Sequence, residues 1–330
     1  MRLHVTMLNG IGTASAASIA MRNVATIAKE FGATEMNFYK YDVNYDSDKE
    51  LSARLDGILA PMWHGDVIIL QLPTWNDIKY ENTFVNKIRG YSNSKIVMFV
   101  HDIIPLMMNL GEDYLLKCVE LYNKADVLIL PSREMHELLK TKGLTVEKVL
   151  YQEIWDYPMQ LEHVGPTFER TLHFPGHSDR YPFIKEWKGE SIIELYGSPK
   201  FTDSPKFKFN PLIKSNLMIY KILRRGFGLL WAGEEQMEYC KLNQPFKLGT
   251  FLAAGLPIIV QRGMHVSQFV VENEIGFAVD TLEEADCIVQ EMTEQEYLKL
   301  SERVEKYQFL VTSGCYTRKL INDAIILALK

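Results

Sequence analysis

Cysteine is scarce in this sequence of 330 residues, and the four that occur lie far apart in the chain. Cys118, Cys240, Cys287 and Cys315 form no Cys-x-x-Cys pair. This spacing provides no disulfide framework of the kind that staples small secreted domains. Scattered single cysteines favour free thiols in a reducing compartment, so we expect a cytoplasmic protein.

Long apolar runs and an excess of positive charge are also missing. No window approaches the ~18 uninterrupted apolar residues of a membrane-spanning helix. The N-terminus, MRLHVTML, lacks the apolar core and cleavage site of a signal peptide. With 36 basic and 42 acidic residues the formal net charge is −6, so the balance gives no sign of a general nucleic-acid-binding protein.

The sequence does contain short β-branched runs that alternate with helical patterns. In the first half these runs occupy residues 3–8, 36–41, 66–72, 95–100, 126–130 and 146–151. Similar runs occupy residues 170–174, 191–196, 227–231, 256–260 and 276–279 in the second half. Strands that alternate with helices in this way predict parallel βαβ units. After residue 294 the pattern predicts two helices and no strand.

We therefore predict an α/β fold with two doubly wound domains that face a central cleft. The domains are expected over residues 1–160 and 161–312, with a C-terminal helix over 313–330. This last helix, which contains INDAIILALK, is apolar enough to pack on the first domain or to form an oligomer interface. In open α/β folds ligands bind at the carboxyl ends of the strands, where each suggestive segment below is placed.

The segment NGIGTASA, residues 9–16, follows the first predicted strand and opens a helix. Its glycines allow a backbone to approach a ligand closely. Gly10 and Gly12 resemble part of a dinucleotide fingerprint, with Asp42 as a ribose ligand, but Ser15 stands where the third glycine would be. The alternatives are a plain turn, in which Thr13 or Ser15 caps the helix, and a loop that contacts a substrate.

The segment VHDIIP, residues 100–105, ends another predicted strand. His101 and Asp102 could position a sugar hydroxyl, or the aspartate could cap the segment that follows.

No group of residues predicts a metal site. The Asp46–Ser47–Asp48 triplet resembles a metal-binding Asp-x-Asp, but its place before a polar helix favours a capping turn. His173 and His177 flank the start of the second domain without a cysteine or carboxylate cluster to complete a site.

The stretch NQPFKLGTFLAAGLP, residues 243–257, predicts a helix of small residues with a lysine at its start. A cation there opposes the helix dipole, and a bound phosphate would reverse the sign of that interaction. Arg180, in the loop FPGHSDRYPFIKEW after an earlier strand, can grip two phosphate oxygens. Together Arg180 and Lys247 predict a clamp for a diphosphate, although either side chain could simply be exposed to solvent.

Trp231, Glu234 and Glu235 follow another strand, in FGLLWAGEE. These side chains could line a nucleotide base or ribose, and a capped helix start explains them equally well.

The combination of NGIGTASAASIAMRN, VHDIIPL, GFGLLW and NQPFKLGTFLAAGLPIIVQ resembles the GT-B sugar-nucleotide glycosyltransferases. More narrowly, the whole chain is similar to the glucosyltransferase 3 type, bacterial enzymes that extend glycans on serine-rich repeat adhesins. The resemblance implies a retaining transferase that uses a UDP-sugar such as UDP-glucose. Because no metal site is predicted and Arg180 and Lys247 could stabilise the diphosphate instead, we expect no metal or other cofactor. It also implies an acceptor that already carries N-acetylglucosamine, an acceptor-side first domain and a nucleotide-sugar-binding second domain. We also expect a homo-oligomer.

The resemblance also assigns roles to residues. It implies His101 and Asp102 as acceptor or sugar ligands and Asp102, Arg180 and Lys247 as catalytic residues. The donor ligands that it implies are Gly12, Thr13, Ser15, Arg180, Asn243, Lys247 and Thr250. The Glu-x7-Glu pattern of the wider retaining family is absent, because Leu242 and Thr250 occupy the corresponding positions. A non-catalytic relative that assists another transferase, and an NAD-dependent dehydrogenase, are the alternatives.

Overall fold

The computed structural model describes residues 1–13, 15–159, 165–175, 181, 183–196, 206–210 and 223–330. The chain forms two compact units. The first contains Met1–Glu153 together with Tyr316–Lys330, and the second contains Ile154–Cys315.

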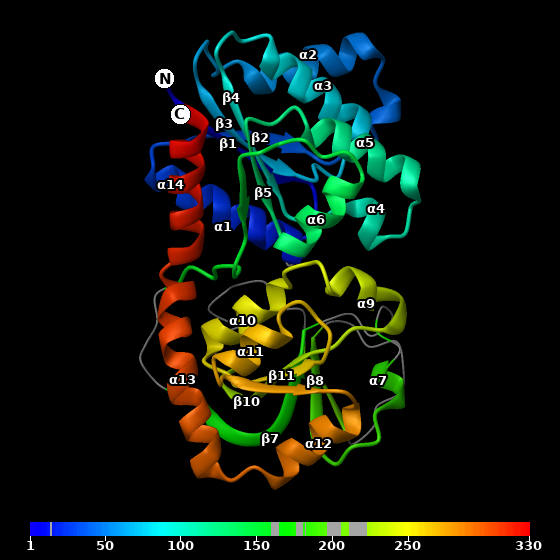
Figure 1. Cartoon of the computed structure of the whole chain (residues 1–330), viewed down its shortest axis with the longest axis vertical. Helices are drawn as coiled ribbons and strands as arrows, with labels where there is room; N and C mark the ends of the chain where they lie inside the picture. The colour runs from blue at the N-terminus through cyan, green and yellow to red at the C-terminus, as the bar shows by residue number, and fades with distance from the viewer. Residues whose placement is uncertain (14, 160–164, 176–180, 182, 197–205, 211–222) are drawn as a thin grey trace. The chain divides into compact units, whose positions relative to one another are not determined.

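The first unit is built on a parallel sheet in the order β2-β1-β3-β4-β5-β6 (Figure 1). Its strands are β1 (Leu3–Asn9), β2 (Thr34–Tyr39), β3 (Val67–Leu72), β4 (Lys95–Val100), β5 (Val127–Leu130) and β6 (Val149–Tyr151). Every residue of β3 is buried, as expected for a central strand that is covered on both faces.

Helices surround this first sheet. They are α1 (Ala16–Glu30), η1 (Val43–Tyr45), α2 (Asp48–Leu59), α3 (Ile78–Arg89), α4 (Ile104–Met107), α5 (Glu112–Tyr122), α6 (Arg133–Thr141) and α14 (Cys315–Leu329). The C-terminal helix α14 packs beside α1, where Arg318 binds Glu30 through two hydrogen bonds of 2.8 Å (Figure 1). The last helix of the chain thus completes the unit that the N-terminus begins.

The second unit repeats the design with a parallel sheet in the order β12-β11-β10-β7-β8-β9. Its strands are β7 (Thr167–Phe174), β8 (Ile192–Tyr196), β9 (Phe207–Asn210), β10 (Arg225–Leu230), β11 (Ile258–Gln261) and β12 (Gly276–Val279). Its described helices are α7 (Phe183–Glu186), α9 (Glu234–Cys240), α10 (Phe246–Ala254), α11 (Ser267–Glu272), α12 (Leu282–Glu291) and α13 (Glu294–Thr312).

The predicted α/β class with two doubly wound sheets is confirmed, and so are the two helices after residue 294. The sequence analysis missed β9, whose four residues FKFN are too short and too polar to stand out. Lys208 and Asn210 of this strand bind Glu194 of β8, so partners across the sheet stabilise it.

Strand order fixes where ligands are expected to bind. In each unit, successive βα connections run in opposite directions from a central pair of strands, which leaves a crevice at their carboxyl ends. The pair is β1 and β3 in the first unit, and β7 and β10 in the second. The segments after these four strands are the natural place to look for a site.

Across the part of the chain that the structure describes, no helix is both long enough and apolar enough to cross a membrane.

Candidate functional site

Lys247 lies at the N-terminus of α10, in the second unit, with its ammonium between two aromatic rings. Its Nζ atom is 4.1 Å from the centre of the Phe174 ring and 4.3 Å from that of Tyr181. Nζ also donates a hydrogen bond of 3.2 Å to the Tyr181 hydroxyl. Since Phe174 ends β7, these contacts place Lys247 at the carboxyl edge of the central strand pair.

Close backbone approach fixes α10 in this position. A Cβ on Gly249 would lie 2.0 Å from the Trp155 carbonyl oxygen, and one on Gly228 of β10 would lie 2.3 Å from the Phe251 ring. The Trp155 indole donates a hydrogen bond of 2.8 Å to the carbonyl of Gln244, just before the helix. The small residues of this stretch therefore let α10 pack tightly, as the sequence indicated.

The N-terminus of α10 has no side-chain cap. Pro245 occupies the N-cap position and makes no capping hydrogen bond. The Thr250 hydroxyl donates to the Phe246 carbonyl at 3.3 Å, so this residue, 6% exposed, is turned toward its own helix. Asn243 is partly buried just before the helix. Arg180, the other half of the predicted clamp, lies outside the described residues.

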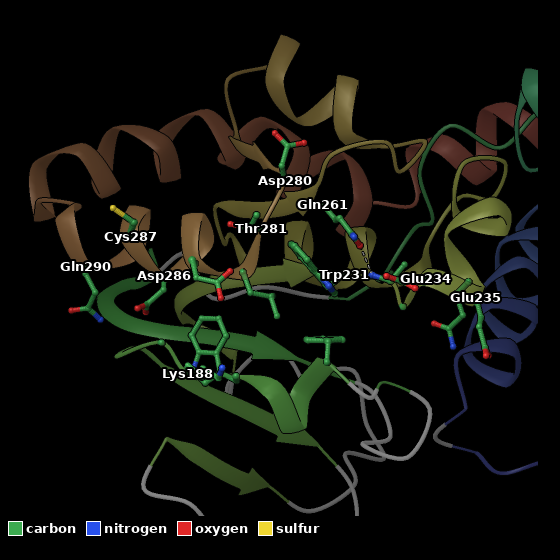
Figure 2. Close-up of a pocket in the computed structure, with 18 of the residues that line it drawn as sticks. Lys188, Trp231, Glu234, Glu235, Gln261, Asp280, Thr281, Asp286, Cys287 and Gln290 are labelled. Atoms are coloured by element: carbon green, nitrogen blue, oxygen red, sulfur yellow. Dashed lines mark hydrogen bonds between the residues drawn. The ribbon is translucent and has the colours of Figure 1, made fainter.

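A pocket of about 1170 Å³ opens at the carboxyl ends of β10, β11 and β12. Figure 2 shows Asp286 and Gln290 of α12 on one side and Trp231 with Glu234 toward the other. Six acidic residues and one lysine are among those that line it: Glu234, Glu235, Asp280, Glu283, Asp286, Glu291 and Lys188. Asp280 pairs with Arg262, and Asp286 accepts from the backbone amides of Glu190 and Ser191. Carboxylates of this kind can accept hydrogen bonds from hydroxyl groups, whereas they would repel a diphosphate.

Aromatic rings connect this pocket with the lysine. The Trp231 ring lies 6.1 Å from that of Phe183, which lies 5.1 Å from that of Phe174 beneath the Lys247 ammonium. A ligand in this region would meet a positive charge at one end and hydroxyl-binding carboxylates at the other. The placement suits a molecule with both a phosphate and polar uncharged groups.

In β8 of the second sheet, Glu194 forms an ionic cluster that the sequence analysis missed. Its carboxylate, which is 2% exposed, accepts hydrogen bonds of 2.8 Å from Lys208, 2.7 Å from Arg225 and 2.9 Å from Asn210. Although burial opposes the charged form, these donors hold the pKa of Glu194 below its ordinary value. The cluster links β8, β9 and β10 through hydrogen bonds and ion pairs.

His173 is part of the same buried network and is not placed as a metal ligand. Its Nδ1 lies 2.6 Å from the Tyr196 hydroxyl and its Nε2 lies 2.7 Å from the Arg225 carbonyl oxygen. Because a carbonyl only accepts, the proton is on Nε2. Burial lowers the pKa of His173 to about 4, so the ring is neutral near pH 7. His177 lies outside the described residues.

In the first unit the glycine loop follows β1. Gly10 has φ +82°, and a Cβ there would lie 2.8 Å from the Tyr39 ring, so glycine is required. Gly12 and Thr13 are exposed, and a Cβ on Gly12 would meet open space. Ser15 is the N-cap of α1 and accepts a hydrogen bond of 3.1 Å from the Ser18 amide. Both Thr13 and Ser15 are exposed, but the Ser15 hydroxyl caps a helix.

The aspartates of the first unit have local partners. Asp42 caps the 3-10 helix η1 and accepts from the Asn44 amide at 3.0 Å, which gives it a local structural role. Asp46 pairs with Arg54 at 2.9 Å, and Ser47 forms a capping box at the start of α2. The prediction of a capping turn is confirmed.

Among the described residues, no cluster of three or more His, Cys, Asp or Glu side chains is arranged to hold a metal ion.

His101 is a core residue. It is 3% exposed, its ring stacks on Phe99 with centres 4.9 Å apart, and its Nε2 lies 2.9 Å from the Gln71 Oε1 atom. The Gln71 amide nitrogen in turn donates to the carbonyls of Thr6 and Met21. Burial lowers the pKa of His101 to about 3. This position favours a structural role that ties β3 and β4 to β1 over direct contact with a sugar.

Asp102, the next residue, is more exposed than His101. The short helix α4 begins after Ile103, which supplies no side-chain cap. Of the His-Asp pair, Asp102 is therefore the residue that solvent can reach.

Comparison with known protein families shows which family the chain belongs to. A family model described as the glucosyltransferase 3-like N-terminal domain matches residues 2–154, and the model of the C-terminal domain of the same family matches residues 172–324. The chain belongs to the glucosyltransferase 3-like family. Glucosyltransferase 3 of Streptococcus parasanguinis is 36% identical over 330 residues, which cover 100% of this chain and 99% of the relative. Glucosyltransferase 3 of Streptococcus gordonii is 36% identical over 331 residues, or 99% of each chain.

Solved structures share the fold at much lower sequence identity. An α-glucosyltransferase in complex with UDP and a 13-mer DNA superposes with a TM-score of 0.67 at 14% identity and covers 99% of each chain. Anabaena HepE, solved with UDP and glucose, gives 0.65 at 12% identity and covers 98% of this chain and 99% of its own. The predicted GT-B fold is confirmed, and family membership makes the protein a glycosyltransferase.

Proposed function

We propose that the protein transfers a hexose, most simply glucose, from a UDP-sugar to a sugar already attached to a serine-rich repeat adhesin, with retention of anomeric configuration. The curated relatives named glucosyltransferase 3 support the sugar, and UDP or UDP-glucose complexes of structural neighbours support the nucleotide. The observation that carries the proposal is the Lys247 ammonium at the start of α10, beside the end of β7.

The chemistry requires a stabilised leaving group. As UDP departs, negative charge grows on the β-phosphate while the anomeric carbon becomes oxocarbenium-like. Fixed positive groups aimed at that phosphate stabilise the transition state more than the ground state. Lys247 and the amides at the N-terminus of α10 supply two such groups, and Arg180 is the third by sequence. This arrangement would replace a metal ion.

The remaining roles follow from accessibility. Gly12 and Thr13 lie in an exposed loop at the central strand pair of the first unit and are assigned to the donor. Asn243, which precedes α10, is assigned to the donor. Thr250 supports the first turn of α10, and Ser15 supports the start of α1 through its cap. Asp102 or a phosphate oxygen of the donor takes the proton of the acceptor hydroxyl. No carboxylate nucleophile is assigned.

The proposed compartment is the cytoplasm. All four cysteines are free thiols in the structure, and Cys118 is buried, which suits a reducing environment.

The test is a panel of sugar nucleotides assayed for UDP release with a serine-rich peptide that bears N-acetylglucosamine and with the bare peptide. The expected result is turnover with UDP-glucose and the modified peptide only. Lys247→Ala should reduce transfer by about 10²-fold or more, the scale for removing one preorganised charge-stabilising group. Binding of UDP without turnover of any donor would instead identify a non-catalytic partner of another transferase.

A further inference from the structure

The loop Pro73–Asp77 connects β3 to α3 at the central strand pair of the first unit. Because β1 and β3 are neighbours in the sheet, this loop and the glycine loop Gly10–Ser15 leave the same edge side by side. Its sequence, Pro-Thr-Trp-Asn-Asp, has the composition of an ordinary turn apart from the tryptophan.

The backbone of this loop is strained. Trp75 has φ +61° and Asp77 has φ +132°, although neither is a glycine. A bulky side chain rarely adopts such a conformation, and it persists only where the surroundings impose it. Strain of this kind gathers at sites that bind ligands, so the loop calls for a functional explanation.

Neighbouring residues hold the loop in this strained conformation. Glu81 of α3 accepts hydrogen bonds from the Thr74 amide at 2.6 Å and from the Thr74 hydroxyl at 3.0 Å. The Asn76 side chain donates to the Tyr39 carbonyl at 3.0 Å and accepts from the Tyr41 amide at 2.8 Å. Neighbours on α3 and at the end of β2 thus hold the two residues that flank Trp75.

The Trp75 side chain differs from these neighbours. Its indole nitrogen is buried and has no hydrogen-bond partner among the described residues, while the residue as a whole stays partly exposed. No polar contact therefore explains the ring's position. The ammonium of Lys40 lies 6.0 Å from the ring centre. Tyr39, which precedes Lys40 and whose carbonyl Asn76 binds, lies against Gly10 and is 69% exposed.

We propose that Trp75 and Tyr39 form an aromatic platform that binds one pyranose ring of the acceptor glycan. The inference rests on the proposed function and adds the substrate-binding surface of the first unit. A pyranose has an apolar face of C–H groups that packs on an aromatic ring, and its hydroxyls can bond polar groups at the rim. The exposed side chains of Lys40 and Asp77 and the Tyr39 hydroxyl supply such a rim.

The experiment compares Trp75→Leu and Tyr39→Leu with wild type in steady-state transfer from UDP-glucose to the N-acetylglucosamine-bearing peptide. Trp63→Leu is the matched control. Trp63 is 66% exposed in the same unit but lies before the N-terminal end of β3, away from the carboxyl edge where Trp75 lies. For Trp75→Leu we expect KM for the glycopeptide to rise about tenfold, as for truncation of a buried aromatic anchor. The KM for UDP-glucose and the melting-temperature shift caused by UDP should stay unchanged, and Trp75→Phe should recover most of the loss.

Two results would overturn the platform. One is a glycopeptide KM in Trp75→Leu equal to that of Trp63→Leu. The other is a lost UDP-induced shift with an unchanged glycopeptide KM, which would assign the ring to the nucleotide base of the donor. Circular dichroism melts check folding, and if Trp75→Leu does not fold, Tyr39→Leu and Trp75→Phe decide.

A further measurement separates this inference from the proposed function. Calorimetric titration of the glycopeptide and of the bare peptide, without donor, reports binding alone. If wild type binds the glycopeptide but transfers nothing, and Trp75→Leu binds it more weakly, the proposed transfer is wrong and the platform stands. If wild type transfers glucose but Trp75→Leu binds the glycopeptide as tightly as wild type does, the platform is wrong and the transfer stands.

Discussion

Replacing Glu81 by glutamine should make the first unit more stable at pH 8 and change it little at pH 4. Glu81 lies in α3 and is 7% exposed. Burial raises the pKa of its carboxyl group from an ordinary value of 4.5 to about 7, against the opposing effect of the hydrogen bonds from Thr74. The folded protein therefore keeps a proton that the unfolded chain releases above pH 4.5.

The sign of the effect follows from this difference. Between pH 4.5 and 7 the folded state binds more protons than the unfolded state, so stability falls as pH rises through this window. At about 1.4 kcal/mol for each pH unit the loss approaches about 3 kcal/mol above pH 7. Glutamine resembles the protonated acid and suffers no such loss.

Hydrogen exchange of the α3 and β3 amides at pH 5 and pH 8 measures the effect locally, which avoids treating a two-unit chain as a single unfolding transition. Glu120→Gln, on the exposed side of α5, is the control. If Glu81→Gln gains no more protection than Glu120→Gln between the two pH values, the pKa of Glu81 is not raised in the folded protein and the reasoning fails.

Four further predictions concern the loops and the chemistry. Gly10→Ala should cost about 1–2 kcal/mol of stability because of its left-handed backbone, whereas Gly12→Ala should leave a melt nearly unchanged, and equal melts would contradict the assignment. Turnover should survive millimolar EDTA. If EDTA abolishes activity and Mn²⁺ restores it, the metal-free mechanism is wrong and Asp46 and Asp48 become candidate metal ligands. Mass spectrometry should detect hexose on the glycopeptide and none on bare serine-rich peptide; equal addition to both would reject a glycosylated acceptor. Lys247→Ala should abolish the stabilisation that UDP gives in a thermal-shift assay.

The sequence predicted the features that depend on local pattern. The alternation of strands and helices identified both sheets, and the polar Asp46–Asp48 turn was recognised as a cap because it precedes a polar helix. The structure shows the cap as a capping box between Ser47 and Glu50. The placement of Lys247 at a helix start was also readable, since proline and small residues mark that boundary.

Features that depend on contacts between distant residues were not readable. Glu194 binds residues 14 and 31 positions away, and nothing in the sequence marks these partners. His101 looked like a site residue because it ends a strand, but only the packing of Phe99 and Gln71 shows that its ring is buried. The Pro73–Asp77 loop was missed because its residues are those of any turn, while the positive φ at Trp75 is visible only in the structure.

Lys247 shows why a lysine is tolerated where the helix dipole disfavours it. The dipole opposes the charge by about 0.3–1 kcal/mol. The faces of Phe174 and Tyr181, at 4.1 and 4.3 Å, each stabilise the ammonium by about 0.5–1 kcal/mol. Together the two rings contribute about 1–2 kcal/mol and outweigh the dipole term. Lys247→Ala should therefore lower the melting temperature of the empty protein only modestly, and the control Lys241→Ala on the exposed end of α9 should leave it nearly unchanged. With UDP present only Lys247→Ala should lose the ligand's stabilisation. A large drop in the melting temperature of Lys247→Ala with UDP binding intact would mean that the aromatic contacts serve folding and that the phosphate lies elsewhere.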